Sequence, residues 1–194
     1  MATPEDVLAF WLDELEPKDW YNSSPELDQK IKDRFEDTWK QVHAGALGLW
    51  LTYPTGTLAY ILLTDQFSRN MFRGKAKAFS TDKYALAAAK AAISRGWDMR
   101  IDEPARMFFY MPLEHSENLC DQDRSVRLML TRLEATRDEM LLHAKCHRDI
   151  IRRFGRFPFR NTALGRDTTS AEAEFMEQGA YGAVVQAFRA KEAA

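Results

Sequence analysis

The sequence has few cysteines and no long apolar segment. Of its 194 residues only Cys120 and Cys146 are cysteines, too few for a disulfide framework, so we expect reduced thiols in a cytoplasmic protein. Residues 1–6 lack the basic and apolar regions of a signal peptide, and no uncharged apolar stretch approaches ~20 residues. These absences predict a protein that is neither exported nor membrane-spanning.

An excess of charge is missing as well. The 27 Lys and Arg residues nearly balance 29 Asp and Glu residues, which leaves a formal net charge of −2. Such a balance creates no global field that would recruit nucleic acid or an anionic membrane. We therefore expect neither as a partner, while the cofactor, if any, and the oligomeric state remain unknown at this stage.

Strand signals are also lacking, because no alternating run of β-branched residues is bounded by hairpin turns. Helix signals are frequent instead, including Thr3-Pro4, Ser24-Pro25 and the capping box formed by Thr169 and Glu172. They predict an all-α fold of about eight helices, with Pro112 breaking the fifth and Ser116 capping the sixth. The expected helices begin near residues 4, 25, 57, 80, 102, 116, 138 and 169.

The length and the hydrophobic fraction of 45% suit one domain over residues 1–194, with a tail after about residue 178 that is peripheral or less ordered. Short connections favour antiparallel helical hairpins, and no fixed repeat is present. The longest loop, Arg156 to Thr168, is a candidate functional segment.

The helix expected from Thr57 to Arg73 places charge on an apolar face. At about 100° per residue, Asp65 and Arg69 fall within roughly 20° of Leu58 and point inward. The opposite side is also apolar, which predicts a central helix covered all round. A narrow polar strip of the same helix holds Gln66, Asn70 and Arg73.

Two interpretations of this helix remain open. In the first, Asp65 and Arg69 form an intrahelical ion pair, and the neighbouring amides satisfy backbone groups. In the second, the helix is a pocket wall in which Arg69 and Arg73 bind a carboxylate or phosphate while Asp65 orients Arg69. A buried pair gains little stability, which is why the second interpretation is worth testing.

The helix from Asp138 to Phe154 projects His143 and His147 from its apolar arc. They are either hydrogen-bonded core residues or functional groups, with His147 the better candidate for a general base or hydrogen-bond donor. The His-x-x-x-His spacing also suggests a metal, with Glu114, His115 and Glu117 as further ligands. Because the first histidine is not followed by glutamate, the zinc-protease motif fails, and we assign no metal ligand.

Two further segments have both a structural and a functional interpretation. Residues 112–117 are either a helix break with a cap, or they place His115 and a glutamate in a pocket with His147. The helix dipole explains basic residues up to Arg153, but not Arg156 or Arg160 on the long loop, where anion binding is plausible.

Several motifs together resemble one family. They are residues 62–70 (LLTDQFSRN), 72–74 (FRG), 111–117 (MPLEHSE), 147–158 (HRDIIRRFGRFP) and 160–161 (RN). They are similar to a bacterial family of unknown function whose fold is described as tetratricopeptide-like, over about Val7 to Phe175. The resemblance implies an irregular array of helical hairpins and no established activity. The motif positions on this chain are Asp65, Gln66, Arg69, Asn70, Arg73, Glu114, His115, Glu117, His147, Arg156, Arg160 and Asn161.

The sequence departs from the family pattern at two positions. Ser68 stands where proline is usual, and Phe159 where histidine commonly precedes Arg-Asn. If that histidine were a catalyst or a ligand, this chain would lack it. His143 lies outside the family motif, which weakens the metal interpretation.

These observations lead to three hypotheses. The first is a pocket that binds a small anionic molecule through the motif arginines, with His147 and His115 as acid–base or hydrogen-bonding groups. The second is a protein- or peptide-binding scaffold, as tetratricopeptide-like arrays usually are. The third is a metal-dependent hydrolase that uses the His/Glu cluster. Whether the protein is an enzyme is left open by the sequence.

Overall fold

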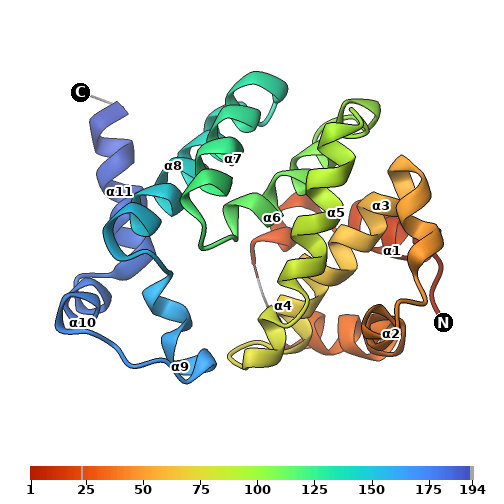
Figure 1. Ribbon diagram of the computed structural model, residues 1–194, viewed down its shortest axis with the longest axis horizontal. Helices are drawn as coiled ribbons and strands as arrows, with labels where there is room; N and C mark the ends of the chain where they lie inside the picture. The colour runs from red at the N-terminus through yellow and green to blue at the C-terminus, as the bar shows by residue number, and fades with distance from the viewer. Residues whose placement is uncertain (23, 193–194) are drawn as a thin grey trace. The chain divides into compact units, whose positions relative to one another are not determined.

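The computed structural model describes residues 1–22 and 24–192, and within them it contains helices and connecting turns but no strand (Figure 1). The all-α prediction is therefore confirmed. The chain divides into two compact units, Met1–Pro112 and Leu113–Ala194. The expectation of a single domain over residues 1–194 stays a prediction.

The first unit is built from five α-helical segments, two of which are extended by wider π-helical turns. The turn Ala9–Glu14 continues α1, and the turn Leu62–Phe67 joins α3 to α4 in one unbroken helix. Short 3-10 turns make up most of the connections. The segments are α1 (Pro4–Leu8), α2 (Pro25–His43), α3 (Pro54–Ile61), α4 (Ser68–Met71) and α5 (Asp82–Ser94).

Aromatic side chains fill the core of this unit. The Phe35 and Phe67 rings lie 4.8 Å apart between centroids, and Trp11 is 5.2 Å from Phe67. Such offset and tilted ring pairs combine a large buried apolar area with favourable quadrupole geometry. The α3–α4 helix runs through this core with almost every side chain from Gly56 to Ser68 buried. The prediction of a central helix covered all round is confirmed.

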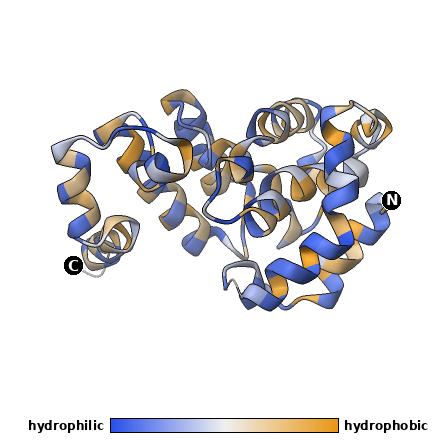
Figure 2. Ribbon diagram, turned by 90° about the horizontal axis from the view of Figure 1, so that it is seen from below, coloured by the Kyte–Doolittle hydropathy of each residue, from blue (hydrophilic) through white to orange (hydrophobic). Residues whose placement is uncertain are grey.

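The second unit consists of five helices together with the end of α6 (Met111–Glu114). The short connection 133–136 folds α8 back on α7 as a helical hairpin, and α11 packs against α8. Hydrophobic and hydrophilic residues alternate along these helices, as expected for elements with one buried face (Figure 2). The helices are α7 (Leu119–Arg132), α8 (Arg137–Phe154), α9 (Asn161–Leu164), α10 (Ser170–Glu177) and α11 (Ala180–Glu192).

Three local expectations need correction. The expected fifth α-helix is replaced by the 3-10 helix Ala105–Phe109, and Pro112 lies in the first turn of α6, where its missing N–H costs nothing. Asn118 caps α7 by accepting from the N–H groups of Cys120 and Asp121, while the Ser116 hydroxyl donates to the Asp121 carboxylate instead.

The C-terminal part of the chain is helical. Residues 180–192 form α11, whose Val184 is buried with Leu142 and Ile150 in the core of the second unit. The expectation of a peripheral or less ordered tail after about residue 178 stays a prediction. The loop from Arg156 to Thr168 contains a 3-10 turn, Pro158–Arg160, and the single-turn α9. Within the described residues, no helix is both long enough and apolar enough to cross a bilayer. The tetratricopeptide-like arrangement stays a prediction.

Candidate functional site

Asp65 and Arg69 form the expected ion pair, and a third residue completes it. The Asp65 carboxylate is 1% exposed and lies 3.1 Å from Nη1 of Arg69. The guanidinium of Arg69 also donates to both carboxylate oxygens of Asp82 on α5, at 2.9 and 3.0 Å. Burial alone would lower the pKa of Arg69, but the two carboxylates outweigh it and raise the pKa above its ordinary value. The cation is thus held between two anions.

Arg73 has a carboxylate partner of its own. Its Nε and Nη2 donate to the two oxygens of Asp28 on α2, at 2.8 and 3.0 Å, and the Asn70 amide donates to the same carboxylate at 2.9 Å. Gln66 donates to Asp65 at 2.6 Å. Arg73 and Asn70 therefore connect this helix to α2 through Asp28. The Gln66 and Asn70 amides bind carboxylate side chains, and not the backbone groups that the structural interpretation assigned to them.

The basic residues of the long loop are paired in the same way. Arg156 donates to both oxygens of the Glu172 carboxylate at 2.6 and 2.8 Å. This pairing, followed by the Thr169 N–H, lowers the pKa of Glu172 to about 2. The Asn161 amide reaches Glu172 at 3.3 Å, and the Arg160 guanidinium stacks 4.5 Å from the Phe157 ring centroid.

Glu117 joins the two ends of this loop. Its carboxylate accepts from the backbone N–H of Phe157 at 2.8 Å and from both terminal nitrogens of Arg166 at 2.7 and 3.1 Å. Burial would raise the pKa of Glu117, but the Arg166 guanidinium and the Phe157 N–H hold it below its ordinary value. Glu117 is therefore a residue that fixes the loop rather than a free ligand.

The second unit also contains a buried carboxylate paired with an imidazole. The Glu114 carboxylate, 5% exposed, lies 2.7 Å from Nδ1 of His147, which is also 2.9 Å from the carbonyl oxygen of His143. Burial would raise the pKa of Glu114, but the imidazoles of His147, His115 and His143 together hold it below its ordinary value. The carboxylate stays ionised at neutral pH and fixes the imidazole.

Aromatic rings enclose the His147 imidazole. Its centroid is 4.7 Å from the Tyr181 ring, 5.5 Å from Phe157 and 6.2 Å from His115. The side chain of His147 is 15% exposed, so it is confined but remains accessible. This environment orients one nitrogen of His147 through a buried anion and places the ring beside a second imidazole.

His143 belongs to a parallel chain of hydrogen bonds. Its Nδ1 contacts the Tyr181 hydroxyl, and its Nε2 lies 3.0 Å from Glu139, which also accepts from Arg189 at 2.8 Å. Burial, followed by the nearby Glu114 charge, raises the pKa of Tyr181 far above its ordinary value, so the phenol stays protonated and donates. With Nε2 of His143 donating to Glu139, its Nδ1 is the acceptor for Tyr181.

The metal interpretation finds no ligand set in residues 1–22 and 24–192, because no group of three or more His, Cys, Asp or Glu side chains there could hold a metal ion. The two histidines of the His-x-x-x-His spacing are directed to different partners, His143 to Tyr181 and Glu139, His147 to Glu114.

The candidate residues fall into both units. The first unit contains those of the α3–α4 helix, and the second contains the histidines, Glu114, Glu117 and the loop residues. The hypothesis of one shared site for Arg69 and His147 stays a prediction. Within each unit, the residues are brought together by partners that sequence reasoning did not identify: Asp28, Asp82, Glu139 and Tyr181.

Comparisons with known proteins show the family to which the chain belongs. The family model described as a bacterial protein of unknown function (DUF924) matches residues 7–180. A solved structure of a protein of unknown function from Agrobacterium tumefaciens is 38% identical, with a TM-score of 0.84, over 90% of this chain and 97% of that chain. The search of curated proteins found no match. The chain belongs to the DUF924 family of bacterial proteins of unknown function.

Proposed function

We propose that the second unit acts on or binds a small molecule through His147, with Glu114 as the residue that orients the imidazole. The observation that supports this most strongly is that Nδ1 of His147 faces two hydrogen-bond acceptors, Glu114 Oε1 and the His143 carbonyl oxygen. Two acceptors require the proton to be on Nδ1. In the neutral ring the lone pair is then on Nε2, which is the nitrogen available to a ligand.

The chemistry of such a site is proton transfer or hydrogen bonding. A carboxylate behind an imidazole stabilises the imidazolium that forms when the imidazole accepts a proton, and this arrangement recurs in general-base catalysis. His115, whose ring lies 6.2 Å from that of His147, supplies a second titratable group beside it. We therefore propose a hydroxyl- or carbonyl-bearing small molecule as the ligand.

The arginines of the original anion-binding hypothesis are not part of this proposal. Arg69, Arg73 and Arg156 each donate two hydrogen bonds to one carboxylate of their own unit. A bidentate carboxylate already occupies the geometry that a ligand carboxylate or phosphate would need. A ligand would have to displace that partner.

A thermal-shift screen of small metabolites tests the proposal. At a concentration 100 times its Kd, a ligand should raise Tm by about 5 to 10 °C. The shift should disappear in His147→Gln and shrink in Glu114→Gln. The matched control is His43→Gln, which removes an exposed imidazole from the first unit and should leave the shift unchanged.

Two results would contradict the proposal. One is a set of stabilising compounds whose shifts are the same in wild type and His147→Gln. The other is a ¹⁵N NMR spectrum in which neutral His147 has its proton on Nε2. A protein-binding scaffold, the alternative hypothesis, predicts that no small-molecule shift depends on His147.

A further inference from the structure

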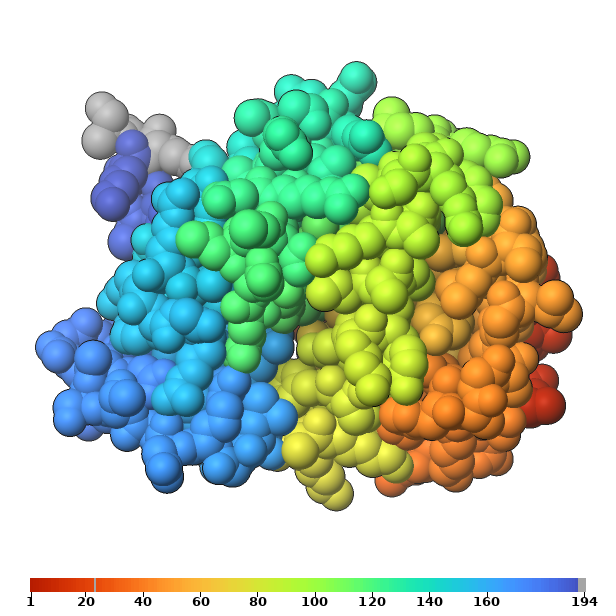
Figure 3. Space-filling view, in the orientation of Figure 1, coloured from red at the N-terminus to blue at the C-terminus, as the bar shows by residue number. Residues whose placement is uncertain are grey.

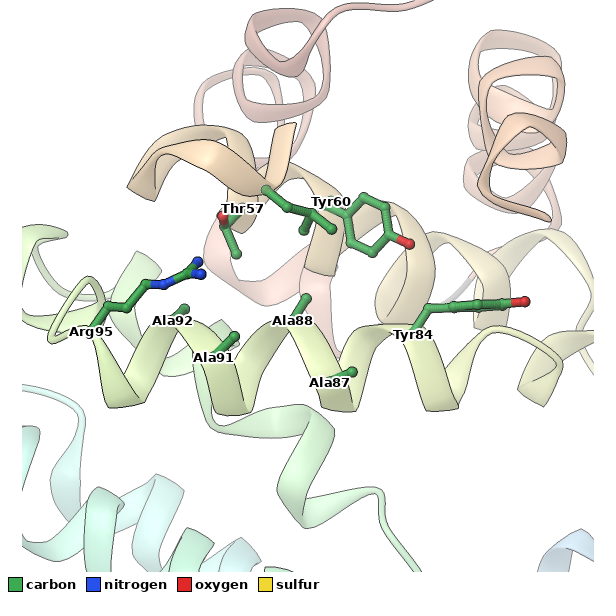
Figure 4. Close-up of a pocket in the computed structure, with 9 residues that line it drawn as sticks. Thr57, Tyr60, Tyr84, Ala87, Ala88, Ala91, Ala92 and Arg95 are labelled. Carbon is green, nitrogen blue, oxygen red and sulfur yellow. The ribbon is translucent and has the colours of Figure 1, made fainter. Parts of the chain in front are cut away.

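A cavity of about 290 Å³ lies between α3 and α5 inside the first unit (Figure 4). Its floor is made of the methyl groups of four α5 residues, Ala87, Ala88, Ala91 and Ala92, which share one helix face. Because no longer side chain stands at these positions, the space above them is open. The α5 segment also reaches the molecular surface in the space-filling view (yellow-green in Figure 3). The volume is at the small end of the usual range for ligand pockets.

A largely buried tyrosine lines this cavity. Tyr60 on α3 is 6% exposed, and within the described residues its hydroxyl forms no hydrogen bond. Burial, with a contribution from the neighbouring Tyr84, raises the pKa of Tyr60, so the phenol remains a donor. Because this hydroxyl has no hydrogen-bond partner within the described residues, it is available to donate to an acceptor on a ligand.

A guanidinium is placed at the other end of the alanine row. Figure 4 shows Arg95 beyond Ala92, extending toward the cavity, and Tyr60 and Tyr84 toward the opposite end. Arg95 stacks 4.7 Å from the Trp97 ring centroid and has no carboxylate partner in the part of the chain that the structure describes. It differs in this from Arg69, which is held between two carboxylates.

Between Arg95 and the two tyrosines, the cavity is lined mainly by apolar side chains. The α3 and α5 helices satisfy their own backbone groups, so they offer nothing to the amides of a bound peptide. An alkyl chain has no polar groups, so its burial against the alanine methyls leaves no hydrogen bond unsatisfied. From Tyr84 to Arg95 the helix rises roughly 16 Å, which suits a chain of medium length.

We propose that this cavity binds an unbranched medium-chain carboxylate, with its carboxylate on Arg95, its alkyl chain on the α5 alanines and its far end beside the Tyr60 hydroxyl. A polar group at that far end, such as a terminal hydroxyl, accepts the hydrogen bond that Tyr60 lacks. The site is in the first unit and does not depend on the function proposed for His147.

Calorimetric titration of the full chain with decanoate, octanoate and 10-hydroxydecanoate tests this inference. Wild type should bind decanoate saturably at one site, and affinity should fall about fourfold for each methylene removed. Arg95→Gln should weaken binding at least tenfold, and Ala91→Leu should abolish it by filling the floor. The control Arg100→Gln removes another exposed arginine of the same unit and should leave the affinity for decanoate unchanged.

Tyr60→Phe separates the two ends of the site. It should leave decanoate binding unchanged and remove the preference for 10-hydroxydecanoate. The inference is overturned if none of the three carboxylates binds saturably, if Arg95→Gln binds as wild type does, or if decylamine binds as tightly as decanoate. Unaltered thermal unfolding of each variant shows that the fold is kept.

Discussion

The two units place charge in helix-facing positions in different ways. In the first unit, the Arg69 guanidinium is held between the carboxylates of Asp65 and Asp82. In the second, the buried Glu114 carboxylate contacts Nδ1 of His147, and the pair does not use Nε2 of that imidazole. The first arrangement occupies its arginine with two carboxylates, whereas the second leaves one imidazole nitrogen available.

This difference shows how an inward polar residue is to be interpreted. Sequence periodicity detects that a charged side chain faces the core. It does not distinguish an arginine bound by carboxylates from an imidazole held by a carboxylate. The distinction comes from the partner. Where the partner is a bidentate carboxylate, the residue connects helices; where a carboxylate holds an imidazole, the arrangement is suited to proton chemistry.

The largest loss of stability should come from breaking the ion pair between Asp65 and Arg69. Asp65→Ala leaves the Arg69 guanidinium, 19% exposed, with one carboxylate fewer in the core, and we expect a loss of about 3 kcal/mol in urea unfolding. Arg73→Ala, whose side chain is half exposed, should cost less than about 1 kcal/mol.

A double variant sharpens this test. Asp65→Leu combined with Arg69→Met replaces the pair by apolar groups and should recover much of the lost stability, because the desolvation cost of both charges disappears. A loss below about 1 kcal/mol for Asp65→Ala would show that the two units do not differ as described.

Breaking the Glu114–His147 pair should reverse the way in which stability depends on pH. In wild type the pKa of Glu114 is below its ordinary 4.5, so its contribution to stability is present above that pH and is lost as pH falls through the folded pKa. In His147→Leu, burial should dominate and raise the pKa of Glu114 above its ordinary value. That variant should then gain stability as pH falls from 7 toward 5.

Carboxyl ¹³C NMR titration, together with Tm measured between pH 3 and 7, checks this reversal. Glu114→Gln removes the titrating group and should abolish both trends. A Glu114 pKa in His147→Leu that stays below 4.5 would contradict the electrostatic account of the pair.

The smallest effect concerns the loop, and it disappears in acid. The pKa of Glu172 is lowered from 4.5 to about 2 by Arg156 and the Thr169 N–H, so the stability it contributes is present above pH 4.5 and is lost between pH 4.5 and 2. Glu172→Gln should be less stable than wild type at pH 7, and the difference should close near pH 2.

Glu177→Gln is the matched control, since it removes an exposed carboxylate from the same helix, α10. It should change the free energy of unfolding by less than about 0.5 kcal/mol. Urea unfolding at pH 7, 4 and 2 measures both variants, and a constant Glu172→Gln difference over this range would refute the assignment.

Much of the fold could be predicted from the sequence, because helix starts and apolar stripes are local signals. The inward direction of Asp65 and Arg69 and the capping box at Thr169 were predicted correctly. Ser116 and Asn118 are both good caps two residues apart, and intrinsic preference does not choose between them. The hydrogen bond from Ser116 to Asp121 decides in favour of Asn118.

The partners in the candidate site could not be predicted, because they are brought together by tertiary packing. Asp28 is 45 residues from Arg73, and Tyr181 is 38 residues from His143. Glu172 was recognised only as a capping residue, although its carboxylate also binds Arg156. Periodicity gives the direction of a side chain, but not what the next helix places opposite it.

The wide turns 9–14 and 62–67 constrain the length of the chain as well as its composition. Phe10 and Trp11 of the first contact Phe67 of the second, with ring centroids 5.8 and 5.2 Å apart. Each such turn holds one residue more than regular α-helical winding would. Deleting a single residue between 62 and 67 would restore regular winding and swing Arg69 about 100° away from Asp82. This helix should therefore tolerate substitutions far more easily than the insertion or deletion of a residue.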